Sequence, residues 1–104
     1  MKRGTTPTFT LSLEGIDYNM LDTVYVTFKQ DNHVITKTGD DVKLDEENQI
    51  INVALTQSET LSFRQGYVFI QLRAITKGGN AVATDIVRIN ADGILKEEIG
   101  RAHV

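Results

Sequence analysis

The stretch that decides the fold is residues 67–89, which read YVFIQLRAITKGGNAVATDIVRI. In its first half every second residue is apolar, which is the pattern of a β-strand with one face in a hydrophobic core. The residues on that face are Val68, Ile70, Leu72 and Ala74. Gly78 and Gly79 follow, and two glycines between such runs predict a tight turn with positive φ at both positions. Residues 67–89 are therefore predicted to form one long β-hairpin.

A two-residue loop at Gly78-Gly79 also defines which residues of the hairpin lie opposite each other. The pairs expected on the core face are Val68 with Ile89, Ile70 with Val87, Leu72 with Asp85 and Ala74 with Ala83. The pairs expected on the other face include Phe69 with Arg88 and Ile75 with Val82. Asp85 is the only charged residue on the core face, so we expect a β-bulge that turns it outward.

The rest of the chain carries five further strand patterns and one helix signal. The predicted strands span residues 8–13, 22–30, 33–37, 42–44 and 49–55. Thr56 with Glu59 three residues later forms a capping box, which predicts one or two helical turns within 56–63. The larger core side chains are predicted to be Phe9, Phe28, Phe63 and Phe69, with Ile16 and Met20 closing one end.

About seven short strands separated by polar turns predict an all-β fold, an immunoglobulin-like β-sandwich, with an open barrel as the competing architecture. A chain of 104 residues is long enough for one core of this kind. The sandwich is expected over residues 1–93, followed by a C-terminal tail at 94–104. Leu95 and Ile99 stand four residues apart, as on one helical face, so the tail is predicted to be a helical or docking segment.

Composition and charge exclude several classes of partner. The net charge is −3 and the 11 Lys and Arg residues are scattered from Lys2 to Arg101, so neither nucleic acid nor an anionic membrane is expected as a partner. No apolar run approaches the roughly 18 residues of a membrane span, and no signal peptide is recognisable. The chain has no Cys, which excludes thiol catalysis and favours synthesis in a reducing cytoplasm.

No residue set in the sequence matches a catalytic or ligand-binding motif, so no catalytic, metal or cofactor residue is predicted. His33 and His103 have no second ligand at metal spacing. The acidic residues within 40–47 lack the spacing of a calcium loop. No Ser lies in a nucleophile elbow, and Gly78-Gly79 joins strands instead of opening a helix. The chain is therefore not expected to be an enzyme.

Three tyrosines suggest an alternative function. Tyr18, Tyr25 and Tyr67 could together form an exposed stacking platform for sugars, with Tyr25 on the outer face of its strand. A carbohydrate- or cell-surface-binding module is therefore the second hypothesis.

Three segments in a fixed order carry a family resemblance. They are Arg3–Thr8 (RGTTPT), Val26–Gln30 (VTFKQ), and Leu55–Leu61 (LTQSETL) with Gln71–Arg73 (QLR) downstream. Together they resemble small proteins encoded in the tail-assembly region of siphophages and prophages of Gram-positive bacteria. Those proteins look similar to the immunoglobulin-like N-terminal domain of phage upper baseplate proteins. The resemblance covers about Arg3 to Leu95, whereas residues 101–104 fit no pattern of that family.

The resemblance implies a virion structural or tail-assembly protein that is made in the host bacterial cytoplasm. Its implied partners are other tail or baseplate proteins and further copies of itself. The first surface expected to dock is the edge formed by Thr5, Thr6, Pro7 and Thr8, and the second is Ile94 with Leu95. The alternative is that both segments complete the core of a monomer.

Overall fold

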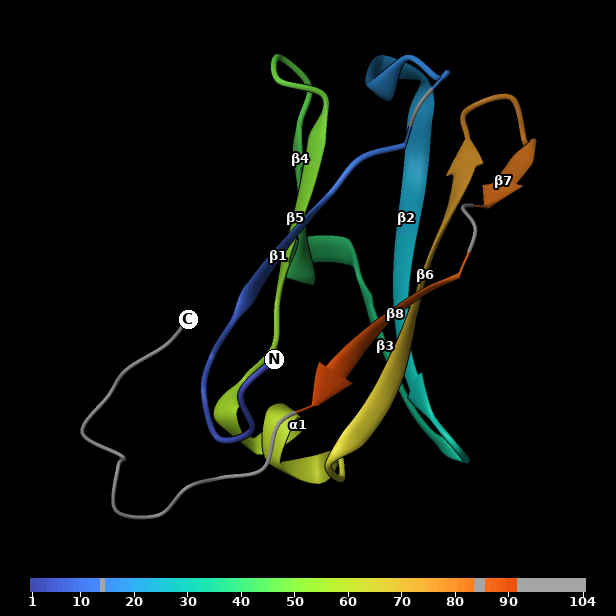
Figure 1. The fold of residues 1–104 in the computed structure, drawn as a ribbon. Helices are drawn as coiled ribbons and strands as arrows, with labels where there is room; N and C mark the ends of the chain where they lie inside the picture. Colours follow the sequence, from blue (N-terminus) through green and yellow to red (C-terminus); the bar gives the residue numbers. More distant parts are fainter. Residues whose placement is uncertain (14, 84–85, 92–104) are drawn as a thin grey trace.

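Two antiparallel β-sheets lie face to face in the computed structural model, which describes residues 1–13, 15–83 and 86–91 (Figure 1). The smaller sheet has the strand order β1-β5-β4. Its strands are β1 (Thr8–Leu11), β4 (Val42–Asp45) and β5 (Ile50–Ala54). The larger sheet has the order β3-β2-β6, and both β7 and β8 pair with β6. Its strands are β2 (Leu21–Gln30), β3 (His33–Thr38), β6 (Gly66–Thr76), β7 (Ala81–Ala83) and β8 (Val87–Ala91).

Within residues 1–13, 15–83 and 86–91, three short helical segments connect the strands. They are the 3-10 turns η1 (Tyr18–Met20) and η2 (Gly39–Asp41) and the helix α1 (Gln57–Ser62). The predicted capping box is confirmed, because the Thr56 side chain accepts from Glu59 N at 3.1 Å and Thr56 N donates to Glu59 Oε1 at 2.8 Å. Among the described residues, none of the helices has the length and hydrophobicity needed to cross a membrane.

The strand order confirms the predicted immunoglobulin-like sandwich. In that fold the B, E and D strands share one sheet, and the G, F, C and C′ strands share the other. Here β1, β5 and β4 occupy the places of B, E and D, and β6, β2 and β3 those of F, C and C′. The place of G is divided between β7 and β8, so the described residues form eight strands where about seven were expected.

The predicted hairpin forms, but its turn is one residue longer than expected. Thr76 N donates to Asn80 O at 2.8 Å and Gly79 N donates to Thr76 O at 2.9 Å, so the loop comprises Lys77, Gly78 and Gly79. Only Gly79 of the pair has a positive φ, 88°, which is the geometry of a three-residue loop with one left-handed residue. The prediction of a two-glycine turn is therefore wrong.

Because of the longer loop, the pairing of β6 with β7 differs by one residue from the predicted register, whereas the pairing of β6 with β8 agrees with it. Ala83 lies opposite Arg73 and not opposite Ala74, so the predicted pairing is wrong here. Farther along, Val87 lies opposite Ile70 as predicted. One extra residue between Ala83 and Val87 accounts for the return to the predicted register, as a bulge does. Asp85, the predicted site of that bulge, lies outside the described residues.

The centre of the core consists of the predicted alternating side chains of three strands. They are Val24, Val26 and Phe28 of β2, Ile51 and Val53 of β5, and Val68, Ile70, Leu72 and Ala74 of β6. The other buried apolar residues are Leu13, Tyr18, Leu21, Val42, Leu55, Phe63 and Ala91. Phe28 and Phe63 are fully buried, and the Phe9 ring lies 5.3 Å from that of Phe28. The alternation thus identified the inward faces of both sheets.

Two predicted core residues are exposed instead. Phe69 is 42% exposed, because it follows Val68 in the strand and therefore points away from the smaller sheet. Met20 is 50% exposed, and Tyr18 of the same 3-10 turn fills this end of the core. The Tyr18 hydroxyl oxygen accepts a hydrogen bond from Leu13 N at 2.8 Å, which satisfies the buried phenol.

Candidate functional site

The predicted N-terminal docking segment is largely engaged within its own domain. Gly4 N donates to Thr60 Oγ1 at 3.0 Å, and Thr60 Oγ1 donates to Thr5 O at 2.9 Å. Pro7 is buried, and its carbonyl accepts from Leu55 N at 3.1 Å. Thr6 and Thr8 remain exposed. Docking of a partner stays a prediction for Thr5, Thr6, Pro7 and Thr8, and the carbonyls of Thr5 and Pro7 also hold the segment against α1 and against Leu55, which follows β5.

Strand β1 offers a free backbone edge beside this segment. Pro7 O accepts from the N–H of Leu55, the residue that follows β5, and the hydrogen bonds of an antiparallel pair alternate along the strand. The backbone N–H and C=O of Thr8 and Thr10 therefore point away from β5. Within the described part of the chain β1 pairs only with β5, so an extended segment of another protein could add to this edge.

The second predicted docking residues cannot be placed. Ile94 and Leu95, with the rest of the predicted 94–104 tail, lie outside the described residues. His103 lies there as well, and so does the predicted domain boundary at residue 93.

A third surface was missed by the sequence analysis and covers the outside of the larger sheet, turned away from β1, β4 and β5 (Figure 1). Lys29 lies opposite both Val34 and Phe69, and Phe69 lies opposite Arg88, so these four side chains form one row across four strands. Val34, Tyr67 and Phe69 are each about half exposed. We call this surface the basic–aromatic face and define it by Tyr25, Lys29, Val34, Tyr67, Phe69, Arg73 and Arg88.

Both arginines of the basic–aromatic face lie against aromatic rings. Arg88 Cζ is 4.5 Å from the centre of the Tyr67 ring, and Arg73 Cζ is 5.6 Å from that of Tyr25. Such cation–π contacts hold the guanidinium groups on the sheet while their N–H groups stay available to carboxylates. In the described parts of β2, β3, β6, β7 and β8 the one acidic residue is Asp22, at the β-bulge that begins β2, at the opposite end of that strand from Lys29.

A buried glutamine fixes the end of β6 that carries Tyr67. Gln30 Nε2 donates to Arg64 O at 2.8 Å and to Tyr67 O at 3.2 Å, and Gln30 Oε1 accepts from Arg64 N at 2.7 Å. These bonds join the last residue of β2 to the chain that enters β6. The backbone of Tyr67 is therefore fixed to the end of β2 by the side chain of Gln30.

The predicted platform of three tyrosines does not form. Tyr18 is 1% exposed and belongs to the core. Tyr25 lies opposite Arg73, six residues along β6 from Tyr67, which corresponds to about 20 Å. A single small sugar cannot stack on both remaining rings at once.

His33 and Ser62, far apart in the sequence, meet on the surface between β3 and α1. His33 Nε2 lies 2.8 Å from Ser62 Oγ, and the His33 ring packs edge-on against Phe63. The Ser62 hydroxyl donates its proton to Glu59 O, so His33 Nε2 must be the donor in the contact with Ser62. A histidine that activates a serine accepts this proton instead. As arranged, the pair connects β3 to α1 and does not activate the serine.

A partly buried ion pair connects β3 to α1. Lys37 lies opposite Val26 and so faces inward, and its Nζ is 2.7 Å from Glu59 Oε1. Their side chains are 11% and 25% exposed. Partial burial raises the pKa of Glu59, but the hydrogen bonds from Lys37 and Thr56 and the charge of Lys37 lower this pKa further, to below its ordinary value.

We expect this ion pair to make stability depend on pH. Because the pKa of Glu59 is lower in the folded state, its ionised form stabilises the fold above the ordinary pKa of 4.5, and this contribution is lost as the pH falls through the lowered value. Glu59→Gln keeps a capping-box acceptor and removes the charge. The melting temperatures of wild type and variant should differ most at neutral pH, and the difference should shrink as the pH falls below 4.5 and through the lowered pKa of Glu59.

Thermal unfolding followed by circular dichroism between about pH 3 and pH 7 measures this difference. Glu46→Gln removes the same charge from an exposed turn and is the matched control. An equal difference between wild type and Glu59→Gln at every pH would show that the charge of Glu59 makes no contribution.

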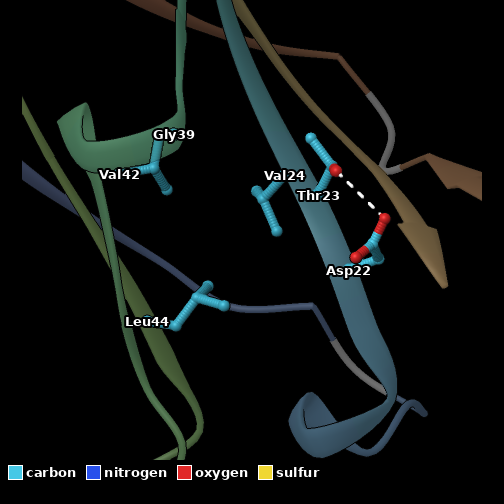
Figure 2. Close-up of a pocket in the computed structure, with 6 residues that line it drawn as sticks. All are labelled: Asp22, Thr23, Val24, Gly39, Val42 and Leu44. Carbon is cyan, nitrogen blue, oxygen red and sulfur yellow. Dashed lines mark hydrogen bonds between the residues drawn. The ribbon is translucent and has the colours of Figure 1, made fainter. Parts of the chain in front are cut away.

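One small pocket opens between the two sheets (Figure 2). It is lined by Asp22, Thr23 and Val24 of β2, Val42 and Leu44 of β4, and Gly39. Its volume of about 160 Å³ is smaller than the roughly 300 Å³ at which ligand pockets begin. Thr23 Oγ1 lies 3.4 Å from Asp22 Oδ2, so the main polar groups of the pocket already face each other.

The acidic residues within 40–47 lie in η2, at the end of β4 and in the turn that follows β4. Across the residues that the structure describes, no three His, Cys, Asp or Glu side chains gather as metal ligands do.

No known protein family, curated protein or solved structure gives a significant match to this chain. The resemblance to phage tail proteins therefore rests on its three quoted segments alone.

Proposed function

We propose that this domain is a non-enzymatic structural or assembly module of a phage tail or baseplate and that it acts through protein–protein contacts. The phage setting is supported by the order of the segments 3–8, 26–30 and 55–61 in the sequence. The mode of action is supported by one observation, the basic–aromatic face. Half-exposed Val34, Tyr67 and Phe69 stand beside three cationic side chains on one side of a single sheet.

This combination of residues is typical of a binding surface. Aromatic residues and arginine are enriched in protein interfaces and dominate their hot spots. Large apolar side chains that are gathered on a surface, and not scattered, mark sites of association. β2 and β6 are the longest strands, at 10 and 11 residues, so the face is presented by regular and hydrogen-bonded backbone. Little conformational entropy has to be lost when a partner docks on it.

The test is binding to the tail proteins encoded beside this gene, measured by biolayer interferometry with the purified domain immobilised. Phe69→Ala and Arg88→Ala should each weaken binding of the true partner at least tenfold, as truncation of interface anchors does. Met20→Ala removes an equally exposed apolar side chain from η1, away from the face, and should leave the affinity within about twofold.

Two results would contradict the proposal. One is that the wild-type domain binds none of the neighbouring tail proteins at about 100 μM, a concentration at which even weak specific contacts are visible. The other is that Phe69→Ala binds the partner as tightly as the wild type and the control variant Met20→Ala do.

A further inference from the structure

The charges of this chain are segregated between two surfaces. The net charge is −3, yet the basic–aromatic face carries Lys29, Arg73 and Arg88 and has no carboxylate among its described side chains. The turn between β4 and β5 has the opposite character, because Asp45, Glu46 and Glu47 follow one another there. We call Asp45–Asn48 the acidic turn.

The acidic turn is held in a defined shape. Asp45 Oδ1 accepts from Asn48 N at 3.1 Å, and Asp45 Oδ2 accepts from Asn48 Nδ2 at 2.9 Å. Gln49 Nε2 donates to Glu46 O at 2.7 Å. Asp45 is bound on both carboxylate oxygens, whereas Glu46 and Glu47 are exposed at the end of the smaller sheet, where the turn projects in Figure 1.

The two charged surfaces belong to different layers of the sandwich. The acidic turn joins two strands of the smaller sheet, and the basic–aromatic face covers the outside of the larger sheet (Figure 1). One copy cannot bring its own acidic turn onto its own face. Two copies can make this contact, and both surfaces of each copy can be occupied by different neighbours.

We propose that the domain associates head to tail, with the acidic turn of one copy docked on the basic–aromatic face of a second copy. This inference rests on the proposed function, because it names a further copy of the chain as one partner of the face. The contact joins two different surfaces, so association continues past the dimer and ends only if the copies close into a ring.

Electrostatics favours this contact over face-to-face pairing. Two basic–aromatic faces placed together would oppose Lys29, Arg73 and Arg88 of each copy, and like charges across an interface disfavour binding. An acidic turn instead offers carboxylates, which accept two parallel hydrogen bonds from an arginine. A simple polyanion would satisfy the same cations and leave Val34 and Phe69 in water, whereas a protein surface can cover them.

Paired charge reversals test the contact directly. The face variant carries Lys29→Glu and Arg88→Glu, and the turn variant carries Glu46→Lys and Glu47→Lys. Sedimentation equilibrium of the full chain in about 50 mM salt should show association of the wild type, and each variant alone should associate at least tenfold more weakly. An equimolar mixture of the two variants should associate again, because each supplies the charge that the other has lost.

A control variant separates this contact from general charge effects. Lys2→Glu with Lys77→Glu changes the net charge as the face variant does, at exposed positions off the face. It should associate like the wild type. Raising the salt to about 500 mM should weaken the wild-type association, since the contact is between exposed charges.

Three results would overturn the head-to-tail contact. A wild type that is monomeric at about 0.5 mM in low salt excludes it, even if a tail protein still binds through Phe69 and supports the proposed function. A face variant that associates like the wild type also excludes it. Binding of polyphosphate through Lys29 and Arg88 by a monomeric wild type would assign the face to a polyanion. Charge-dependent association of a domain that binds no tail protein would support the contact and contradict the proposed function.

Discussion

Replacement of Phe28 by alanine is expected to lower the free energy of unfolding by about 3–5 kcal/mol. Phe28 is fully buried near the C-terminal end of β2, opposite Ile35 on one side and Ile70 on the other. Its ring also contacts that of Phe9, which belongs to the opposite sheet. Its removal leaves a cavity between the two layers that the hydrogen-bonded strands around it cannot close.

The neighbouring pair of the same two strands provides a matched control. Phe69 lies opposite Lys29, one position along from Phe28, and it is 42% exposed on the other side of the sheet. Phe69→Ala should therefore lower the free energy of unfolding by less than about 1 kcal/mol. Urea unfolding followed by circular dichroism measures both values. Equal losses in the two variants would contradict the assignment of the two faces of the larger sheet.

Thr60→Val is expected to lower the free energy of unfolding by about 1–3 kcal/mol, although the two side chains have nearly the same shape. Thr60 is fully buried, and its hydroxyl accepts from Gly4 N and shares its one proton between the carbonyls of Thr5 and Gln57. Valine cannot replace these bonds, so the N–H of Gly4 and the C=O of Thr5 lose their partner while they stay partly covered. The N-terminal segment should then separate from α1.

Hydrogen exchange distinguishes this detachment from a general loss of stability. The amide of Gly4 should exchange at least tenfold faster in Thr60→Val, whereas amides in the centre of β2 should change less. Thr10→Val is the control, because it replaces an exposed threonine of β1 and should change stability by less than about 0.5 kcal/mol. Unchanged exchange at Gly4 would show that Thr60 does not hold the N-terminal segment.

Local patterns predicted the fold well because each of them reports on a local physical requirement. The alternation of Val68, Ile70 and Leu72 reports on which side of a strand is buried, and the capping box reports on helix-end hydrogen bonds. The loop at Gly79 escaped prediction, since a glycine pair suits a two-residue turn and also the last position of a three-residue loop.

The candidate surfaces depend on contacts that a local pattern does not contain. Phe69 was counted among the large core side chains although the alternation of β6 put it on the opposite face from Val68 and Ile70, and the structure follows the alternation. The row of Val34, Lys29, Phe69 and Arg88 can be recognised only when the registers of three strand pairs are known. The contact of His33 with Ser62 likewise needs the packing of α1 against β3.

The position of β6 has a consequence for folding during translation. β2 pairs with β3, the next strand in the chain, and on its other edge with β6, which is synthesised much later. The β2–β3 hairpin can form as soon as it leaves the ribosome, but one edge of β2 stays open until β6 emerges, which is the condition under which nascent β-proteins aggregate. A slow stretch of synthesis before β6 would lengthen that exposure, so the yield of folded domain should be most sensitive to elongation speed there.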